Sequence, residues 1–323
     1  MNYLYIFILI FAISFVFTNL FKNLAKKSKL VTAQGMPFLG GLAILFSAVV
    51  GLCARPELFL DNAIFSILFG SFIIFILGLV DDLKDLSPWI KLFFQAIAGF
   101  YLISFGIRIR IVFLNDALNI ALTLVWLLAI TNAFNLLDVM DGLCGGLAVI
   151  CSLTFFLLAH FLNNPQIAMM SLYITAASIG FLVFNLPPAK IYLGNSGSTF
   201  LGFFLASIAI AISYAPMERK MAIFTPVFVL GLVIYDLIFV MLMRISKRKS
   251  PIQKSKDHFA LRLISLGFSK KKSLLIMYLL GLLFSLASLI IVRVSNISGF
   301  VIISVVTFIC ILSGIKISRV KVD

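Results

Sequence analysis

The sequence predicts an all-α protein, a polytopic bundle of about eleven transmembrane helices. Of its 323 residues, 62% are hydrophobic and only 12% are charged, whereas soluble domains average roughly 45–50% apolar and 25% charged residues. Apolar runs of about 20 residues, long enough to cross a hydrocarbon core, recur along nearly the whole chain. Because little sequence remains between them, we expect a single transmembrane domain over residues 1–323.

Each predicted span is an apolar run bounded by charge, proline or glycine. We count eleven such runs, with ten spans as the alternative. The first run is expected to be a retained helix, because it lacks the basic segment that precedes the apolar run of a cleaved signal peptide. The eleven runs cover residues 2–21, 37–54, 62–80, 90–105, 117–131, 143–162, 167–186, 199–213, 222–243, 273–292 and 297–315.

The distribution of charge predicts the orientation of these spans. The net charge is +14, and most Lys and Arg residues fall on alternate segments between the spans, with ten of the 26 in residues 244–272. The positive-inside rule then places the N-terminus outside and the C-terminus in the cytoplasm. In a membrane protein this basic surface indicates anionic lipid headgroups, so we expect no nucleic-acid partner.

The first polar motif is a group of carboxylates at the inner end of the 62–80 span. Asp81 and Asp85 share a helical face, and Asp82 adjoins it. Crowded carboxylates at membrane depth are unfavourable unless a cation or a substrate proton relieves them. A solvated helix end, with Lys84 as an ion-pair partner, is the alternative.

The second motif follows the 117–131 span. Asn132, Asn135 and Asp138 recur every three residues, which places their oxygens on neighbouring positions of one helix face. Hard oxygen ligands in this pattern suit Mg²⁺, which favours one or two carboxylates with water and substrate phosphate. Amides that cap broken helices are the alternative.

Two further motifs could bind phosphate. Gly194-Asn195-Ser196-Gly197-Ser198 leads into a span, and a helix start of this kind attracts anions, although Gly-Ser turns before helices are common. His258 and Arg262 lie in the long basic loop, where arginine can bind phosphate in a bidentate manner. The predicted topology places all four motifs on the same side of the membrane, as expected of a site for phosphates and a metal.

In this order, the four motifs resemble those of the polyprenyl-phosphate N-acetylaminosugar-1-phosphate transferase family, which acts in peptidoglycan, O-antigen and teichoic-acid synthesis. The resemblance implies a Mg²⁺-dependent enzyme, with Mn²⁺ as an alternative, in a bacterial inner membrane with its active site facing the cytoplasm. Its substrates would be a polyprenyl phosphate and a UDP-N-acetylhexosamine, with UMP released. A homodimer is left open.

The resemblance also implies roles for individual residues. Asp81, Asp82 and Asp138 match catalytic aspartates, and Asn135, Asp138 and Asn195 match the metal site. The expected substrate-binding residues are Asn132, Gly197, Ser198, His258 and Arg262.

The sequence departs from the family pattern at three places. Asn195 stands where the family usually has a metal-binding aspartate, Val139 replaces a glycine, and Ala260 and Leu261 replace histidines. An amide oxygen can coordinate Mg²⁺ but brings no charge, so we expect weaker metal affinity. A catalytically silent relative that binds lipid phosphate or nucleotide is therefore the main alternative, and a polytopic transporter is a more distant one.

Overall fold

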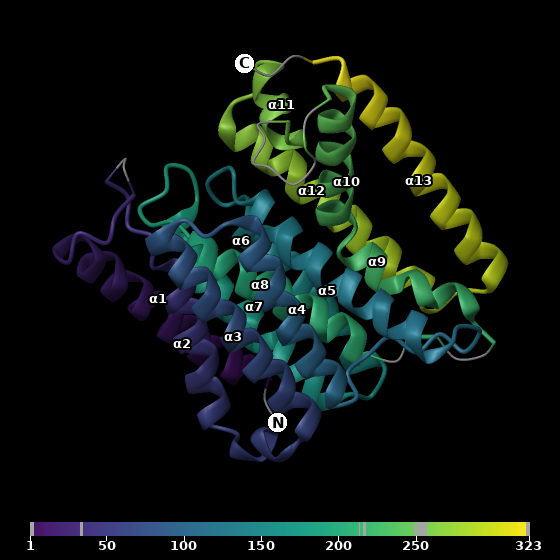
Figure 1. Ribbon diagram of the computed structural model, residues 1–323, viewed down its shortest axis with the longest axis horizontal. Coiled ribbons are helices and arrows are strands. Elements are labelled where there is room, and N and C mark those ends of the chain that lie inside the picture. The colour runs from purple at the N-terminus through teal and green to yellow at the C-terminus, as the bar shows by residue number, and fades with distance from the viewer. Residues whose placement is uncertain are drawn as a thin grey trace. The chain divides into compact units, whose positions relative to one another are not determined.

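The computed structural model describes residues 3–32, 35–212, 214–215, 218–248, 250 and 257–320. Every regular element in these residues is a helix, which confirms the all-α prediction (Figure 1). The chain divides into two compact units, Met1–Ile212 and Ser213–Asp323, and each is described by itself. The expectation of a single transmembrane domain stays a prediction.

The first eight predicted spans each form a helix of the first unit. Within its described residues, the unit contains these helices and one 3-10 turn, η1: α1 (Tyr3–Lys27), α2 (Gly40–Cys53), η1 (Pro56–Leu60), α3 (Asn62–Lys84), α4 (Pro88–Ser104), α5 (Asp116–Leu137), α6 (Leu143–Phe161), α7 (Pro165–Asn185) and α8 (Gly194–Ala211).

Polar residues at the breaks between apolar runs explain where several helices begin. The side chains of Asp61, Ser87, Asn115 and Asn164 accept hydrogen bonds from the first backbone N–H groups of α3, α4, α5 and α7, respectively. Such caps satisfy donors that a helix leaves unpaired at its N-terminus. Local sequence therefore specifies where these helices begin.

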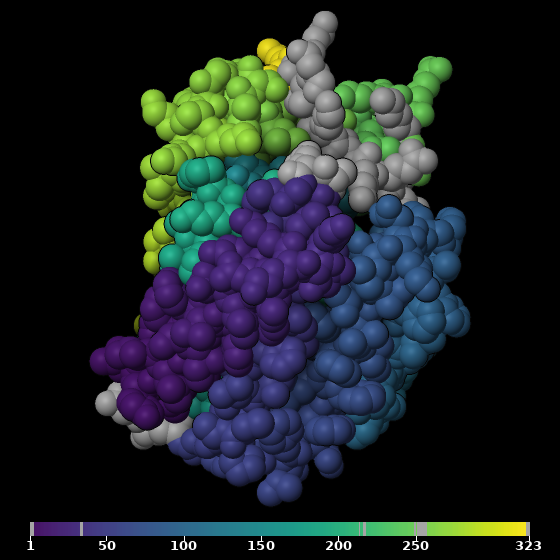
Figure 2. Space-filling view, turned by 90° about the vertical axis from the view of Figure 1, so that its left-hand side faces the viewer, coloured from purple at the N-terminus to yellow at the C-terminus, as the bar shows by residue number. Residues whose placement is uncertain are grey.

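Helix α1 lies along the outside of its unit, where Figure 2 shows it in purple, and packs on α7 and α2. Ser14 Oγ donates a hydrogen bond of 2.6 Å to the carbonyl of Ala177. A Cβ added at Gly180 would lie 2.7 Å from the Ser14 Cβ. Small residues thus allow α1 and α7 to approach closely, as is usual between transmembrane helices.

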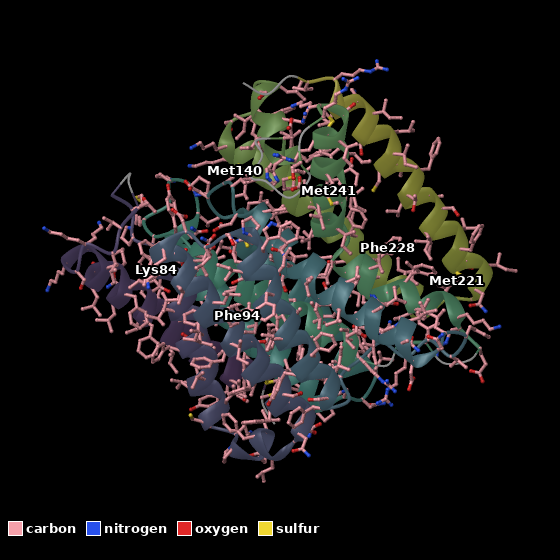
Figure 3. The ribbon with its side chains drawn as sticks, in the orientation of Figure 1. Lys84, Phe94, Met140, Met221, Phe228 and Met241 are labelled. Atoms are coloured by element: carbon pink, nitrogen blue, oxygen red, sulfur yellow. The ribbon has the colours of Figure 1, made fainter. Side chains whose placement is uncertain are left out.

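The second unit contains a broken helix. The segments η2 (Lys220–Phe224) and α9 (Thr225–Val229) meet α10 (Gly231–Ser246) at an angle of 73°, and Figure 3 labels Met221, Phe228 and Met241 along them. A Cβ at Gly231 would lie 2.2 Å from the Phe284 ring. The remaining helices are α11 (Phe259–Ser265), α12 (Lys270–Ile291) and α13 (Asn296–Ser318).

The helices account for all eleven apolar runs. Among the described residues, eight helices are long and apolar enough to span a membrane, or nine if the broken pair is one span. The helices α2 and α4 are apolar but shorter. The protein is therefore a multi-pass membrane protein, whereas the count of eleven crossings and the side of each terminus stay predictions.

Candidate functional site

The paired aspartates at the end of α3 have different partners. Asp81 is only 3% exposed, and its Oδ2 accepts from Lys91 Nζ of α4 at 3.0 Å. Its Oδ1 accepts from the backbone N–H of Leu86 at 2.8 Å. A buried carboxylate needs such partners, so Asp81 joins the end of α3 to the start of α4.

Asp82 turns instead toward α8. Its Oδ1 accepts from the backbone N–H of Asn195 at 2.7 Å, and its Oδ2 from that of Ser196 at 3.0 Å. A helix N-terminus favours an anion because its first N–H groups are unpaired and its dipole is positive there. The carboxylate of Asp82 thus occupies the anion-attracting position that the sequence suggested for phosphate.

The glycine-rich motif forms the first turn of α8 and does not precede the helix as a loop. Gly194 has φ +78°, and α8 begins there, five residues before the start of the predicted span at residue 199. Gly197 and Ser198 are buried, and a Cβ on Gly41 would lie 2.3 Å from the Gly197 Cα. These glycines permit close packing of α2 on α8, and contact of Gly197 and Ser198 with substrate stays a prediction.

The two asparagines of α5 contact different helices. Asn135 Nδ2 donates to Asn195 Oδ1 at 2.9 Å and to Ser198 Oγ at 3.1 Å, which joins α5 to the first turn of α8. Asn132 Nδ2 donates to Gln95 Oε1 of α4 at 2.7 Å. Asn135 therefore belongs to the same cluster as Asp82, whereas Asn132 is paired with α4.

Asp138 directly follows α5 and lies near two other carboxylates. No described residue donates a hydrogen bond to its side chain. Burial, followed by repulsion from Asp82 and Asp141, raises the pKa of Asp138 to about 7. A carboxylate in this environment is stabilised by a cation. The segment after α5 also lies beside the segment before α8, because the backbone N–H of Ala189 donates to Asp141 Oδ2 at 3.1 Å.

The cluster offers few protein ligands for Mg²⁺. Within the described ranges, no three His, Cys, Asp or Glu side chains form a group that could hold a metal. The predicted metal-binding oxygens are the carboxylate of Asp138 and the amide oxygens of Asn135 and Asn195, and the carboxylates of Asp82 and Asp141 lie near Asp138. This set fits Mg²⁺, which commonly takes one or two carboxylates and completes its shell with water and substrate phosphate.

In the second unit, Arg262 is 1% exposed and extensively paired. Its Nη2 donates to Asp257 Oδ1 at 2.7 Å, and its Nη1 donates to carbonyls at the end of α13, those of Ile317, Ser318 and Val320. These bonds satisfy carbonyls that a helix C-terminus leaves unpaired. The structure thus gives Arg262 a role in holding α11 against α13, and its contact with phosphate stays a prediction.

His258 precedes α11 and pairs with a residue that the sequence analysis did not select. Its Nδ1 lies 2.7 Å from Asp236 Oδ2 of α10. Lys91 and Gln95, the partners of Asp81 and Asn132, were also not selected from the sequence. Each of these residues is a polar side chain within an apolar run, which can indicate a functional position, but the sequence does not show which partner such a side chain contacts.

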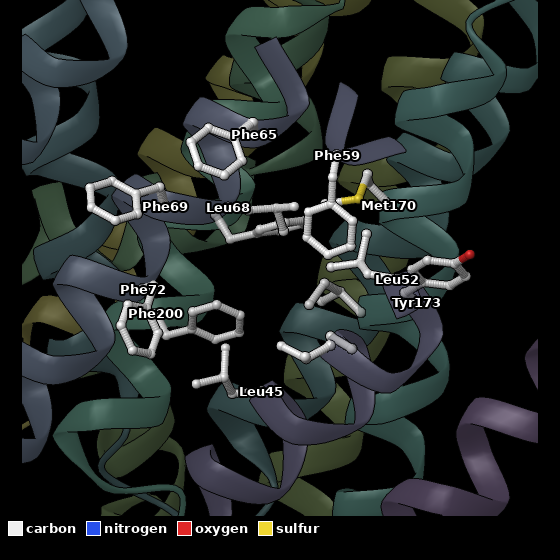
Figure 4. Close-up of a pocket in the computed structure, with 14 residues that line it drawn as sticks. Leu45, Leu52, Phe59, Phe65, Leu68, Phe69, Phe72, Met170, Tyr173 and Phe200 are labelled. Atoms are coloured by element: carbon white, nitrogen blue, oxygen red, sulfur yellow. The ribbon is translucent and has the colours of Figure 1, made fainter. Parts of the chain in front are cut away.

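An apolar cavity of about 190 Å³ also lies in the first unit (Figure 4). Leu45 of α2, Phe69 of α3, Tyr173 of α7 and Phe200 of α8 are among its lining residues. Of the residues of α3 that line the cavity, Phe72 is nearest to Asp81 in sequence, and at 1.5 Å per residue it lies about 14 Å along the helix from it. Because the cavity has almost no polar lining, it is not a site for phosphate.

Comparisons with known proteins identify the family. The family model described as glycosyl transferase family 4 matches residues 64–213, which contain the whole cluster of the first unit. The chain is 33% identical over 263 residues to a probable undecaprenyl-phosphate N-acetylglucosaminyl 1-phosphate transferase of Bacillus subtilis (strain 168), covering 79% of this chain and 73% of that protein.

Two further relatives agree with this assignment. An undecaprenyl-phosphate alpha-N-acetylglucosaminyl 1-phosphate transferase of Thermotoga maritima is 30% identical, with 86% of this chain and 87% of that protein covered. A phospho-N-acetylmuramoyl-pentapeptide-transferase of Staphylococcus saprophyticus is also 30% identical, with 55% of this chain and 63% of that protein covered. The predicted resemblance is confirmed, and the chain belongs to glycosyl transferase family 4.

Proposed function

We propose that this protein transfers an N-acetylhexosamine-1-phosphate, with GlcNAc-1-phosphate as the first choice, from a UDP-sugar to undecaprenyl or another polyprenyl phosphate. The observation that carries the proposal is the cluster of Asp82, Asn135, Asp138 and Asn195 at one end of an apolar helix bundle. Such a cluster suits a water-soluble phosphate donor and a lipid acceptor that meet at the membrane surface. The names of the relatives support the same reaction.

The reaction exchanges one phosphoanhydride (P–O–P) bond for another. An oxygen of the lipid phosphate attacks the β-phosphorus of the UDP-sugar, the bond from that phosphorus to the bridging oxygen breaks, and UMP leaves. Bound Mg²⁺, or Mn²⁺ as an alternative, would supply neutralisation of the phosphate charge. Asp138, Asn135 and Asn195 would hold it through their side-chain oxygens.

The other residues of the cluster would orient the reactants. The Asp82 carboxylate accepts the backbone N–H groups of Asn195 and Ser196 and the Ser196 hydroxyl, three bonds for its roughly four lone-pair positions. Asp82 can therefore accept a proton that remains on the lipid phosphate while it holds the first turn of α8. Asp81 would act through Lys91, whose ammonium it holds near the end of α3. From the resemblance alone, His258 and Arg262 are proposed to bind a phosphate of the substrate.

The cellular setting follows from the same proposal. The product, a sugar linked to the lipid by pyrophosphate, would initiate a cell-envelope glycan such as a cell-wall polymer or lipopolysaccharide. We place the protein in the inner membrane with its site facing the cytoplasm, where UDP-sugars are made. The basic residues on the predicted inner segments support this orientation.

A second candidate function is binding of lipid phosphate or nucleotide without turnover. The observation that favours it is Asn195, whose neutral side-chain oxygen already accepts a bond from Asn135. A metal held there would have less protein charge than one held by an aspartate. The same assay separates the two functions.

The test is release of UMP by purified full-length protein with undecaprenyl phosphate, Mg²⁺ and a panel of UDP-N-acetylhexosamines. UMP release that requires both the lipid and one of the donors supports the transferase and identifies the sugar. Binding of donor or lipid without release, for wild type and for Asn195→Asp, supports the second candidate.

A further inference from the structure

Asp236 and His258 form a buried pair in the second unit. Their side chains are each about 2% exposed, and His258 Nδ1 lies 2.7 Å from Asp236 Oδ2. The other carboxylate oxygen, Oδ1, accepts the backbone N–H of Phe259 at 2.8 Å. One carboxylate thus holds both the imidazole ring and the first residue of α11.

These two bonds determine the protonation of the ring. An ionised carboxylate can only accept hydrogen bonds. Nδ1 must therefore carry the proton that lies between it and Asp236, and in the neutral ring Nε2 has the lone pair. Within the part of the chain that the structure describes, no residue bonds Nε2, so this atom is the one left for a ligand.

The neighbouring charged groups do not replace Asp236 in this role. Asp257, the residue before His258, accepts bonds from Lys247 Nζ at 2.5 Å and from Arg262 Nη2 at 2.7 Å. Arg262 also donates to carbonyls at the end of α13. Asp236 is therefore the carboxylate that bonds the imidazole, and Asp257 provides a matched control one residue away in sequence.

We infer that Asp236 is a positioning residue that fixes His258 as the Nδ1–H tautomer and leaves Nε2 as the ring atom that meets the phosphate of a substrate. The tautomer follows from the geometry of the second unit alone, whereas the contact with phosphate rests on the proposed function. Nε2 accepts a bond from a phosphate hydroxyl or, when protonated, donates to a phosphate oxyanion. No covalent step is assigned to the ring.

The same geometry predicts that Asp236→Asn changes the tautomer of His258. If the amide oxygen keeps the bond from the Phe259 N–H, the amide NH₂ faces Nδ1 and must donate to it. Nδ1 then becomes the acceptor, and the proton moves to Nε2. The substitution thus preserves the size of the side chain but reverses the tautomer of His258.

The test is ¹⁵N nuclear magnetic resonance of the full-length protein labelled on histidine. The chain has only two histidines, so a His160→Gln variant assigns both signals. At about pH 9, where an ordinary imidazole is neutral, wild-type His258 is expected to show the Nδ1–H pattern. Asp236→Asn is expected to show the Nε2–H pattern, and Asp257→Asn the wild-type pattern.

An Nε2–H ring or a mixture of both tautomers in the wild type overturns the inference, even if Asp236→Asn does not fold. A folded Asp236→Asn that keeps the Nδ1–H pattern also overturns it. In the UMP assay, Asp236→Asn is expected to lower kcat about 10²-fold. If no variant or wild type releases UMP, the proposed function fails, but the tautomer result still decides whether Asp236 positions the ring.

Discussion

The Oδ1 atom of Asp82 accepts the backbone N–H of Asn195 at 2.7 Å, across 113 residues of sequence. This bond places the carboxylate of α3 on the first turn of α8. Because α5 joins the same turn through Asn135, Asp82 helps to form the cluster as well as to supply charge. A substitution there affects both stability and activity, and the two effects are separable.

We predict that Asp82→Asn destabilises the first unit. A carboxamide placed in the same orientation keeps an acceptor oxygen for one N–H group of α8 and turns its NH₂ toward the other. Leaving the other unsatisfied costs about 1–3 kcal/mol. Thermal unfolding in detergent measures this loss, with Asp85→Asn as the control.

Asp85 is a suitable control because it lies on the same helix end but is exposed. Its left-handed backbone, with φ 46°, is one that asparagine also tolerates. Equal unfolding temperatures for the two variants would contradict the role given to Asp82.

The ion pair of Asp81 and Lys91 predicts that substitutions of these two residues have non-additive effects on stability. Lys91→Met leaves a buried carboxylate without its cation, which is expected to cost about 3 kcal/mol. Asp81→Asn in the same chain removes the unpaired charge, so the double variant should be more stable than Lys91→Met alone. Additive losses in a double-mutant cycle would mean that the pair is not coupled.

Close packing of α2 on α8 predicts that Gly41→Ala is poorly tolerated. Its Cβ would lie 2.3 Å from the Gly197 Cα, a backbone atom, so one helix must shift. We expect a loss of about 1–3 kcal/mol or more. Gly145→Ala is the matched control, because its Cβ would lie 3.3 Å from a Phe181 ring atom. A Gly41→Ala protein as stable as Gly145→Ala would exclude this packing.

The pKa of Asp138 predicts how metal binding depends on pH. Burial and the nearby Asp82 and Asp141 raise this pKa to about 7, so protons compete with the metal below that value. Metal affinity should therefore be nearly constant above pH 7 and fall by up to about tenfold per pH unit below it. Mn²⁺ titration of wild type at several pH values measures this.

The Asp138→Asn variant provides the control for that titration. It should bind Mn²⁺ weakly at every pH and lose the dependence near pH 7. A wild-type affinity that does not change between about pH 5 and 8 would show that Asp138 is not a ligand.

The helices could be predicted from the sequence because each depends on a local pattern. Apolar runs bounded by caps such as Asp61 and Asn115 form the expected elements. The start of α8 was placed five residues late because its first turn is polar. The N–H groups of that turn are capped by the carboxylate of Asp82, which lies far away in the sequence.

The cluster of Asp82, Asn135 and Asn195 could be predicted as a set of residues but not as a set of bonds. The sequence placed Asp81, Asp82 and Asp85 in one group of carboxylates, yet successive helical residues point in different directions. Asp81 therefore meets Lys91 of α4 and Asp82 meets α8. The pairing of Asp236 with His258 also depends on tertiary packing, which no local pattern encodes.

The most direct test of the account is UMP release by wild type, Asp138→Asn and Asn195→Asp with undecaprenyl phosphate, Mg²⁺ and UDP-N-acetylhexosamines. We expect wild type to release UMP, Asp138→Asn to lose at least about 10²-fold in rate, and Asn195→Asp to need less Mg²⁺. Full activity in Asp138→Asn, or no release by wild type and Asn195→Asp with any donor, would contradict the assignment of this cluster as a transferase site.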